Sequence, residues 1–577
     1  MNNTEIAHAF QQMADLLELR GENAFRVRAY RAGAKAILDL PRSVKDILAD
    51  PVTTLQSYAG IGDTLADKCR VLVETGKLPQ LEELREAVPA VLLQMTRIPG
   101  LGAKKAMVLQ RDLNLQSLDE LRQACEQQRV RLLKGFAAKT EEQILAGLET
   151  ANQVASRLRI DQAERLVERL REHLITCDAV EQIEFAGSYR RGKETVGDID
   201  ILVISHKPQA VMVQLESFPG RATTLARGDT KMSIRVEDAF QVDLRVVAAE
   251  SFGAALQYFT GSMEHNVAVR SRARKLGLTV NEYGITRLND VRAVPAAATE
   301  QQFYEALGLR WIPPELREGR QELQWAESEQ GWPDLIELSH IVADLHSHTT
   351  DSDGSHSISQ MAQAARTLGL QYLAITDHSQ RVSMARGLNS QRLLSQWSRI
   401  DELNQQCADE FRLLKGVECD ILEAGPLDID DATLAEADWV VASVHYGQNQ
   451  SQQQITDRIV GALKNPHVDI VAHPTGRLLG SRPAYAVDIQ AVIQAAAEFG
   501  KALELNASPY RLDLCEQHLL LAAAAGVPIA ISTDAHSTDG LLAMRYGIVQ
   551  ARRAGLLRHQ VLNTWPLSQL LTWLARN

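Results

Sequence analysis

The stretch GSYRRGKETVGDID, residues 187–200, decides how the middle of the chain folds and what chemistry it supports. Its last three residues open an apolar run to Ile204 that is typical of a strand, so Asp198 and Asp200 point to one face. Paired carboxylates repel each other unless cations lie between them, and hard oxygen ligands suit Mg²⁺. A strand predicted over residues 241–247 supplies a third carboxylate, Asp243. These three aspartates predict two-metal phosphoryl transfer.

A second block narrows the kind of enzyme. An isolated Asp-x-Asp is usually a solvated strand edge, and Gly-Ser before Asp-x-Asp marks nucleotidyltransferases in general. The stretch YFTGSMEHNVAVR, residues 258–270, is similar to the thumb of the family X DNA polymerases, and residues 187–200 resemble their palm. Asn281-Glu-Tyr-Gly284 continues the resemblance, which covers roughly residues 1–315. It implies a DNA-directed DNA polymerase with an α+β nucleotidyltransferase palm and a thumb.

The same resemblance implies residue roles. Asp198 and Asp200 bind both Mg²⁺ ions, and Asp243 binds the catalytic one. Arg270 contacts the template strand, and Arg245 influences closure of the active site. The incoming deoxynucleoside triphosphate contacts a larger set: Ser188, Arg191, Gly197, Tyr258, Phe259, Gly261 and Asn266.

The first 150 residues are predicted to be helical, because apolar residues recur at helical spacing from Ile6 to Leu17. Two Gly-x-Gly turns interrupt them, at Gly60-Ile-Gly62 and Gly100-Leu-Gly102. A helix that begins at such a turn offers free N–H groups to a phosphate. Either turn alone could be a plain helix connector, but the pair resembles the helix-hairpin-helix elements that grip the DNA backbone.

Repair polymerases of family X carry a lysine nucleophile for lyase activity in their N-terminal domain. When Gly60-Ile-Gly62 is aligned with the glycine turn of those enzymes, Lys68 falls on the position of that lysine. A Schiff-base lysine needs a pKa lowered by burial or by cationic neighbours. In the animal member of this polymerase family, two lysines lie near the nucleophile. Thr64 and Ala32 stand at their positions in this chain. A phosphate contact or a solvated helix residue is therefore favoured over a lyase nucleophile.

From residue 344 onward, histidines and acids repeatedly follow short apolar segments. Any one of them is usually a hydrogen-bonded core or surface residue, but nine so placed predict a metal cluster at one end of a parallel sheet. The nine are His346, His348, Asp353, His378, Glu418, His445, His473, Asp534 and His536.

This pattern resembles the PHP (polymerase and histidinol phosphatase) family, which implies an α/β distorted barrel with three Zn²⁺ or Mn²⁺ ions. The implied ligand sets are His346, His348, Glu418 and Asp534 for one ion, Glu418, His445 and His473 for the second, and Asp353, His378 and His536 for the third. Arg477 or Arg386 is a candidate to steer a phosphate into the site. The resemblance implies 3′–5′ exonuclease activity, with abasic-site endonuclease or 3′-phosphatase activity as alternatives.

The acidic and basic residues are distributed unequally between the polymerase-like part of the chain and the part that resembles the PHP family. Residues 1–320 carry 43 basic and 43 acidic side chains, whereas residues 321–577 carry 18 and 30. The neutral part can present local basic patches, and the acidic part favours cations. No apolar run reaches the length of a membrane span, the N-terminus does not resemble a signal peptide, and the six cysteines are scattered. These features predict a cytoplasmic protein without membrane contact. We also expect it to be a monomer.

The fold expected from these patterns is multidomain: a helical helix-hairpin-helix region, a palm and thumb, then a PHP-type barrel. The predicted segments are a small lyase-like domain (1–82), fingers (83–150), palm (151–250), thumb (251–315), linker (316–338) and PHP domain (339–577). The leading hypothesis is a repair polymerase that fills short gaps in primer-template DNA and trims 3′ ends. The alternatives are a PHP phosphoesterase whose polymerase half mainly positions DNA, and a DNA-binding scaffold without activity.

Overall fold

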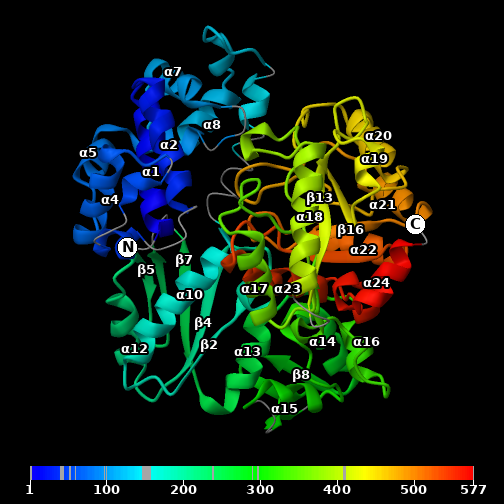
Figure 1. Ribbon diagram of the computed structural model, residues 1–577. Coiled ribbons are helices and arrows are strands. Elements are labelled where there is room, and N and C mark those ends of the chain that lie inside the picture. The colour runs from blue at the N-terminus through cyan, green and yellow to red at the C-terminus, as the bar shows by residue number, and fades with distance from the viewer. Residues whose placement is uncertain are drawn as a thin grey trace. The chain divides into compact units, whose positions relative to one another are not determined.

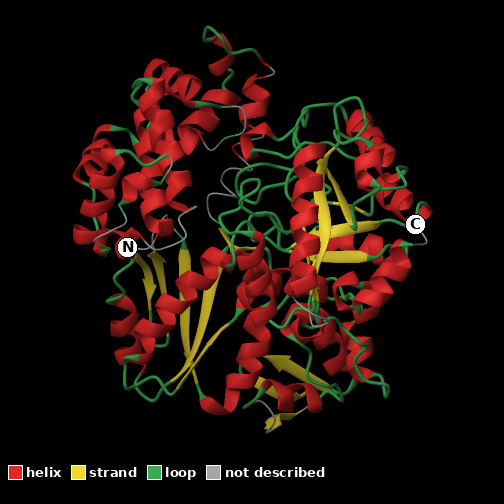
Figure 2. Cartoon of the chain, in the orientation of Figure 1, coloured by secondary structure: helices red, strands yellow, loops and turns green. Residues whose placement is uncertain are grey.

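The computed structural model describes residues 3–38, 44–50, 54–58, 60–96, 98, 101–138, 140–145, 148, 157–236, 240–288, 290–294, 298–406 and 411–575. The chain divides into two compact units, Met1–Ala155 and Ser156–Asn577. Figures 1 and 2 show helices alone in the first unit and a mixture of helices and strands in the second. Within the described residues, no helix is both long and apolar enough to cross a membrane.

The first unit is helical, as its apolar spacing predicts. Ile6, Phe10, Met13 and Leu17 recur on one face of its first helix and are all buried in a shared core. Its α-helices are α1 (Asn3–Leu19), α2 (Ala24–Leu38), α3 (Val44–Ala49), α4 (Asp63–Thr75), α5 (Pro79–Ala87), α6 (Ala90–Thr96), α7 (Ala103–Leu113) and α8 (Leu118–Glu126).

The second unit begins with a five-stranded sheet in the order β2-β4-β7-β6-β5. Burial alternates along β4 and β7, so one face packs on the core with α10 and α12 and the other carries polar side chains. The predicted strands that end at Ile204 and span residues 241–247 are confirmed. The elements are β1 (Leu158–Arg159), α10 (Ile160–Ile175), β2 (Gln182–Phe185), α11 (Gly187–Arg190), β3 (Thr195–Val196), β4 (Asp198–Ile204), α12 (Pro208–Glu216), β5 (Arg221–Arg227), β6 (Lys231–Val236) and β7 (Gln241–Val247).

A smaller layer of helices and a three-stranded sheet follows. Its core contains Val269, Phe303 and Tyr304. The segment after it is folded, not a solvated connector, because Arg317 and Glu322 are both buried. The elements are α13 (Phe252–Thr260), α14 (Met263–Lys275), β8 (Leu278–Asn281), β9 (Gly284–Arg287), β10 (Asp290–Val294), α15 (Glu300–Glu305) and α16 (Glu322–Glu327).

The last part is a nearly closed barrel of seven parallel strands in sequence order, in agreement with the α/β barrel that the PHP resemblance implies. Asn563 fills the seam between the first and last strands: its side chain hydrogen-bonds the backbone of Ala343 and both backbone groups of Ile531. The strands are β11 (Ala343–Asp344), β12 (Tyr372–Ile375), β13 (Arg412–Asp420), β14 (Trp439–Ser443), β15 (Ile470–Val471), β16 (Ala502–Asn506) and β17 (Ile529–Ser532).

Helices cover the outside of this barrel, with α18, α20 and α21 visible around it in Figure 1. Parallel strands joined by helices bring all strand ends of one kind to the same rim. The helices are α17 (Ile358–Thr367), α18 (Ser390–Gln406), α19 (Asp431–Leu434), α20 (Gln452–Leu463), α21 (Ile489–Glu498), α22 (Glu516–Ala524), α23 (Met544–Arg553) and α24 (Leu567–Leu574).

Candidate active sites and metal centres

Three aspartates meet on the polar face of the five-stranded sheet. Asp200 lies directly opposite Asp243 in the parallel pairing of β4 with β7, and Asp198 is two residues before it on the same face. Gly187 permits this arrangement: a Cβ there would lie 2.6 Å from Oδ2 of Asp200, and its φ of +64° suits glycine. Burial and then the charges of Asp198 and Asp243 raise the pKa of Asp200 to about 7. The buried Oδ1 of Asp243 has no hydrogen-bond partner. This crowding of carboxylates fits a divalent cation site.

A cavity of about 450 Å³ opens beside Asp198 and Asp200. Most of the residues predicted to contact nucleotide or template line it: Ser188, Arg191, Tyr258, Phe259, Gly261, Asn266 and Arg270. Asp243 and Gly197 are not among the lining residues. A Cβ at Gly197 would instead lie 3.0 Å from the guanidinium of Arg157.

The aromatic pair at this cavity is held by cations and by a hydrogen-bonded amide. The rings of Tyr258 and Phe259 lie edge to face with centroids 5.1 Å apart. The guanidinium of Arg270 lies 5.5 Å from the ring of Tyr258, and that of Arg245 lies 4.5 Å from the ring of Phe259. Asn266 donates to the carbonyl of Tyr258 at 2.9 Å. The arrangement fixes a flat apolar wall next to the carboxylates.

The two glycine turns in the first unit begin helices as predicted. Gly62 is the N-cap of α4 and Gly102 is the N-cap of α7, and neither has a side-chain cap. A Cβ at either position would meet nothing within 4 Å, so the backbone is open to approach. Gly60 has a φ of +90°, which glycine adopts without strain. Gly100 lies outside the described residues.

Lys68, on α4, has surroundings that the sequence comparison did not anticipate. Its Nζ donates to Oε1 of Gln80 at 2.6 Å. Burial, together with the charge of Arg26, lowers the pKa of Lys68 below its ordinary value. Arg26 lies on α2, 42 positions earlier in the chain, so a cationic neighbour exists although Thr64 and Ala32 supply none.

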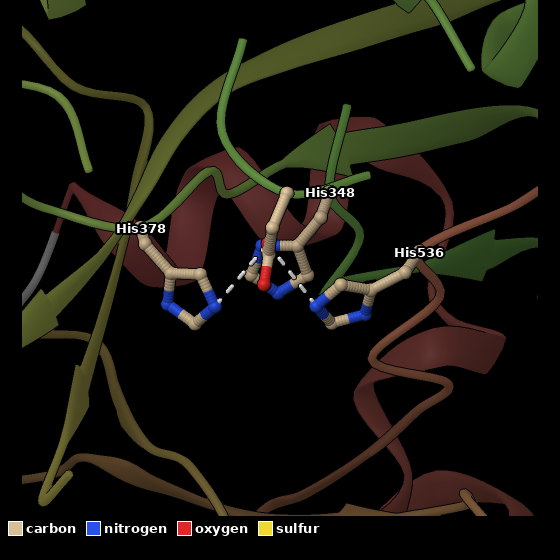
Figure 3. Close-up of side chains that lie close together, drawn as sticks. His348, His378 and His536 are labelled. Carbon is tan, nitrogen blue, oxygen red and sulfur yellow. Dashed lines mark ion pairs between the residues drawn. The ribbon is translucent and has the colours of Figure 1, made fainter. Parts of the chain in front are cut away.

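All nine predicted ligands of the C-terminal part converge at one rim of the barrel. Figure 3 shows the side chains of His348, His378 and His536 turned toward one another. Asp353 pairs with two of them, at 3.5 Å from Nε2 of His378 and 3.3 Å from Nε2 of His536. The rings of His348 and His536 stack with centroids 4.2 Å apart.

Glu418 is the carboxylate at the centre of this cluster. Its oxygens lie 2.7 Å from Nδ1 of His378, 3.0 Å from Nε2 of His473 and 3.3 Å from Nε2 of His445. Nε2 of His346 and Nε2 of His348 lie 3.5 and 3.6 Å from it. Burial favours the neutral acid, but His378 and His445 hold the pKa of Glu418 well below its ordinary value. The group is thus an ionised carboxylate shared by several imidazoles.

Unpaired atoms and donor chemistry show that this rim fits metal ions. Nε2 of His346 and both ring nitrogens of His348 are buried without a hydrogen-bond partner. Three sets of ligand atoms lie close enough to hold an ion: His348, Asp353, His378 and His536; His346, His348 and Asp534; and His378, Glu418 and His445. These sets overlap those implied by the PHP resemblance but differ in membership. His348 joins the Asp353 set, and His378 stands where His473 was expected.

A second layer of acids behind the cluster was missed by the sequence comparison. Oε1 of Glu504 lies 2.8 Å from Nδ1 of His346, and Oδ1 of Asp420 lies 3.2 Å from Nδ1 of His445. Such partners orient metal-binding imidazoles. The signal that could have found them is an acid within an apolar strand, as in ALELN, residues 502–506, or at a strand end, as in VECD, residues 417–420.

The arginines near the barrel rim also differ from expectation. Arg477 is engaged by Glu194 of the five-stranded-sheet layer, with Nη2 of the arginine 2.6 Å from Oε2, so it is not free to steer a phosphate. Arg386 donates to the carbonyl of Ser352, next to Asp353. Arg511 lies closer to the cluster, with Nε 3.5 Å from Oδ2 of Asp534.

Comparisons with known proteins agree with this division of the chain. The family models that match are the helix-hairpin-helix domain (residues 1–78), the SAM-like helix-hairpin-helix tandem (92–150), the DNA polymerase beta palm (157–229), the DNA polymerase beta thumb (255–318) and the PHP domain (344–508).

Curated relatives match either the whole chain or its last part. A probable phosphatase of Thermoanaerobacter sp. (strain X514) is 33% identical over 39% of this chain and 91% of its own length. A probable phosphatase of Syntrophotalea carbinolica is 29% identical over 41% of this chain and 96% of its own length. The protein named DNA polymerase/3′-5′ exonuclease PolX of Bacillus subtilis is 40% identical over the full length of both chains. This chain matches that relative over its full length and combines a DNA polymerase beta palm and thumb with a PHP domain. It therefore belongs to the family X DNA polymerases with a C-terminal PHP domain.

Proposed function

We propose that this chain fills short gaps in DNA by adding deoxynucleotides to a primer 3′ end, and that its barrel removes nucleotides from 3′ ends. The observation that carries the first activity is the pairing of Asp200 opposite Asp243, beside a cavity lined by Arg191 and an aromatic pair. The second rests on nine ligands gathered at one rim of the barrel.

The residues of the first site divide the work of nucleotide addition. Arg191 and Ser188 contact the triphosphate, and the family resemblance assigns Gly197 to the same set of contacts. Tyr258, Phe259 and Gly261 flank the sugar, and Asn266 reaches the minor-groove edge of the new base pair, where acceptors are similar for all pairs. Arg270 contacts the template. The three aspartates would hold Mg²⁺, which when bound would supply neutralisation of phosphate charge and activation of the primer hydroxyl.

The two glycine turns hold DNA without reading its sequence. The N–H groups that follow Gly60-Ile-Gly62 and Gly100-Leu-Gly102 bind backbone phosphates on the two sides of a gap. Their role supports a gapped duplex as the preferred DNA, and we propose that the chain acts on it as a monomer. The segments 1–82, 83–150, 151–250, 251–315, 316–338 and 339–577 serve as the working division into domains.

The barrel site holds three Zn²⁺ or Mn²⁺ ions in this proposal. Imidazole and carboxylate ligands together suit those metals, which supply a nucleophile at neutral pH and stabilise charge on the phosphate. Glu418 is a ligand shared by two of the ions, and Glu504 and Asp420 orient His346 and His445 from behind. The phosphoester is the 3′-terminal linkage of DNA, with abasic-site cleavage and 3′-phosphate removal as alternative reactions of the same site.

Primer extension on a duplex with a one-nucleotide gap tests the polymerase assignment. We expect the wild-type chain to insert the templated nucleotide in Mg²⁺, and Asp243→Asn to abolish insertion because one metal ligand is lost. Glu250→Gln is a matched control, since it makes the same acid-to-amide change at an exposed residue that follows β7. A wild-type chain that degrades 3′ ends without inserting nucleotides would instead support a phosphoesterase whose polymerase half positions DNA.

A lyase activity at Lys68 has one observation in its favour, the lowered pKa that burial and Arg26 impose. Borohydride reduction in the presence of an incised abasic-site duplex measures Schiff-base formation directly. We expect trapping by the wild-type chain that Lys68→Ala removes and Lys77→Ala, a change of an exposed lysine, does not. Equal trapping by wild type and Lys68→Ala assigns Lys68 to phosphate contact instead.

A further inference from the structure

Helix α23 of the barrel packs against the turn that carries Arg191. Nε2 of Gln550 donates to the carbonyl of Gly192 at 2.7 Å, and Nη1 of Arg553 donates to the carbonyl of Arg191 at 2.6 Å. The approach is so close that a Cβ at Gly192 would lie 2.2 Å from Cγ1 of Val549. The turn therefore takes part of its support from a helix more than 350 positions later in the chain.

Arg553 is also the centre of a buried charge network. Its side chain is fully buried and lies 2.9 Å from Oε1 of Glu318, with Glu516 as its second carboxylate partner. Oε1 of Glu318 accepts from Nε of Arg191 at 3.1 Å, and Oε2 lies 3.2 Å from Nζ of Lys193. Burial favours the neutral acid, but Arg553 and Arg191 lower the pKa of Glu318 to about 2, so the carboxylate stays charged.

The guanidinium of Arg191 is oriented by two of its three nitrogens. Nε is held by Glu318, and Nη1 donates to the carbonyl of Thr260. Among the described residues, Nη2 makes no hydrogen bond, and Arg191 lines the cavity beside the aspartates. An arginine whose Nε and Nη1 are already held presents its Nη2 to an anion without losing much further side-chain entropy.

We propose that Arg553 is a positioning residue for nucleotide addition: through Glu318 and the carbonyl of Arg191, this barrel residue fixes the guanidinium that receives the triphosphate. The inference rests on the proposed function, which assigns Arg191 to the triphosphate. Arg553 does not touch the nucleotide. It couples the fold of the barrel, independently of the barrel's metal chemistry, to affinity at the polymerase site.

Steady-state insertion into a one-nucleotide gap tests this role with Arg553→Met, which keeps bulk and removes charge, and Arg553→Lys, which restores charge. Arg553→Met should raise the KM for dTTP about tenfold and change kcat less than about threefold, because an oriented charge contact is lost while the aspartates stay in place. Arg553→Lys should recover most of that loss. The matched control is Arg545→Ala, which removes another α23 contact to the five-stranded-sheet layer, the 2.7 Å ion pair with Glu164.

Inorganic pyrophosphate as a competitor separates positioning from loosened packing. Its inhibition constant should rise in parallel with the KM for dTTP, since Arg191 meets phosphate and not the base. Unchanged KM in Arg553→Met, or an equal rise in Arg545→Ala, overturns the proposal. Should Arg553→Met fail to fold by thermal unfolding, Glu318→Asp takes its place, because withdrawing the carboxylate by one methylene predicts the same rise. A wild-type chain that inserts no dTTP contradicts the proposed function itself, which is a different result.

Discussion

Glu504 lies behind the barrel cluster and orients a ligand without being one of the nine. Its Oε1 is 2.8 Å from Nδ1 of His346, and Nε2 of the same ring faces Glu418 at 3.5 Å and Asp534 at 3.7 Å. A carboxylate that accepts from one ring nitrogen fixes the tautomer, so the other nitrogen is free to bind a metal.

Glu504→Gln is therefore expected to weaken retention of metal by about 10- to 100-fold. The measurement is competition with a chromophoric chelator, followed by metal content from mass spectrometry. Asp469→Asn is a matched control, because Asp469 is a buried acid of the same barrel that bonds the backbone of Val440. Equal retention by wild type and Glu504→Gln would contradict an orienting role.

The sequence predicted metal ligands at positions where the residue type is unusual for the local structure. His346 and His348 stand out because imidazoles at a strand end have few structural reasons to cluster. Glu504 and Arg553 did not stand out, since their importance depends on partners 158 and 235 positions away along the chain. Arg477 was misjudged for the same reason: its partner Glu194 belongs to another layer of the fold.

At the scale of elements, Asn563 replaces the missing pairing between β11 and β17. Its side chain satisfies the N–H and carbonyl of Ile531 and the carbonyl of Ala343 at 2.7 to 2.9 Å. Buried backbone groups without a partner cost about 1–3 kcal/mol each.

Asn563→Ala is expected to lower the free energy of unfolding by roughly 3 kcal/mol, because it leaves these seam groups unpaired. Urea unfolding followed by tryptophan fluorescence measures the change. Asn404→Ala is a comparator with a smaller expected loss, because Asn404, on α18, bonds the two backbone groups of Leu413 on β13, whereas Asn563 bonds three groups on two strands. A loss no larger than that of the comparator would mean that the seam does not depend on Asn563.

A buried ion network joins α11 to α15. Arg190 binds Glu300 through two nitrogens at 2.7 and 2.8 Å, and Arg317 lies 2.5 Å from the same carboxylate. Burial favours the neutral acid, yet Arg317 and Arg190 lower the pKa of Glu300 to about 2, from the ordinary 4.5. The stabilisation is present above the ordinary pKa and is lost as pH falls toward about 2.

Glu300→Gln should therefore cost roughly 3 kcal/mol of unfolding free energy near neutral pH, because two buried arginines lose their counter-charge. The difference from wild type should narrow as pH falls from 4.5 toward 2. Denaturant unfolding at a series of pH values measures it, with the exposed Glu250→Gln as control. A difference that stays constant across this pH range contradicts the assigned pKa.

Which elements form was largely predictable, and how they pair was not. Apolar patterns identified β4 and β7, and the short apolar segments before the histidines and acids of the C-terminal part coincide with β12, β14 and β17. The two-residue strands β11 and β15 are too short to leave a pattern. The register that sets Asp200 opposite Asp243 depends on pairing between strands that are distant in the sequence. The sequence therefore predicted only that Asp198 and Asp200 lie on the same face of their strand.

At the scale of the whole molecule, the palm, thumb and PHP barrel lie in one compact unit, Ser156–Asn577. The excess of acidic residues belongs to the part that begins at residue 321, where carboxylates such as Glu418 and Asp534 belong to groups of side chains that could hold metal ions. Other acidic residues of this part form ion pairs, as Glu516 does with Arg553. The chain can thus carry a net charge of −12 and still present neutral or basic surfaces to DNA.

We propose that two separate metal sites perform two separable reactions. The most direct test follows one labelled primer on a gapped duplex, in Mg²⁺ and in Mn²⁺, with the wild-type chain, Asp243→Asn and His346→Ala. We predict that Asp243→Asn loses extension and keeps Mn²⁺-dependent shortening of the primer, whereas His346→Ala keeps extension and loses shortening. Loss of both reactions from either variant in a folded protein would contradict the claim.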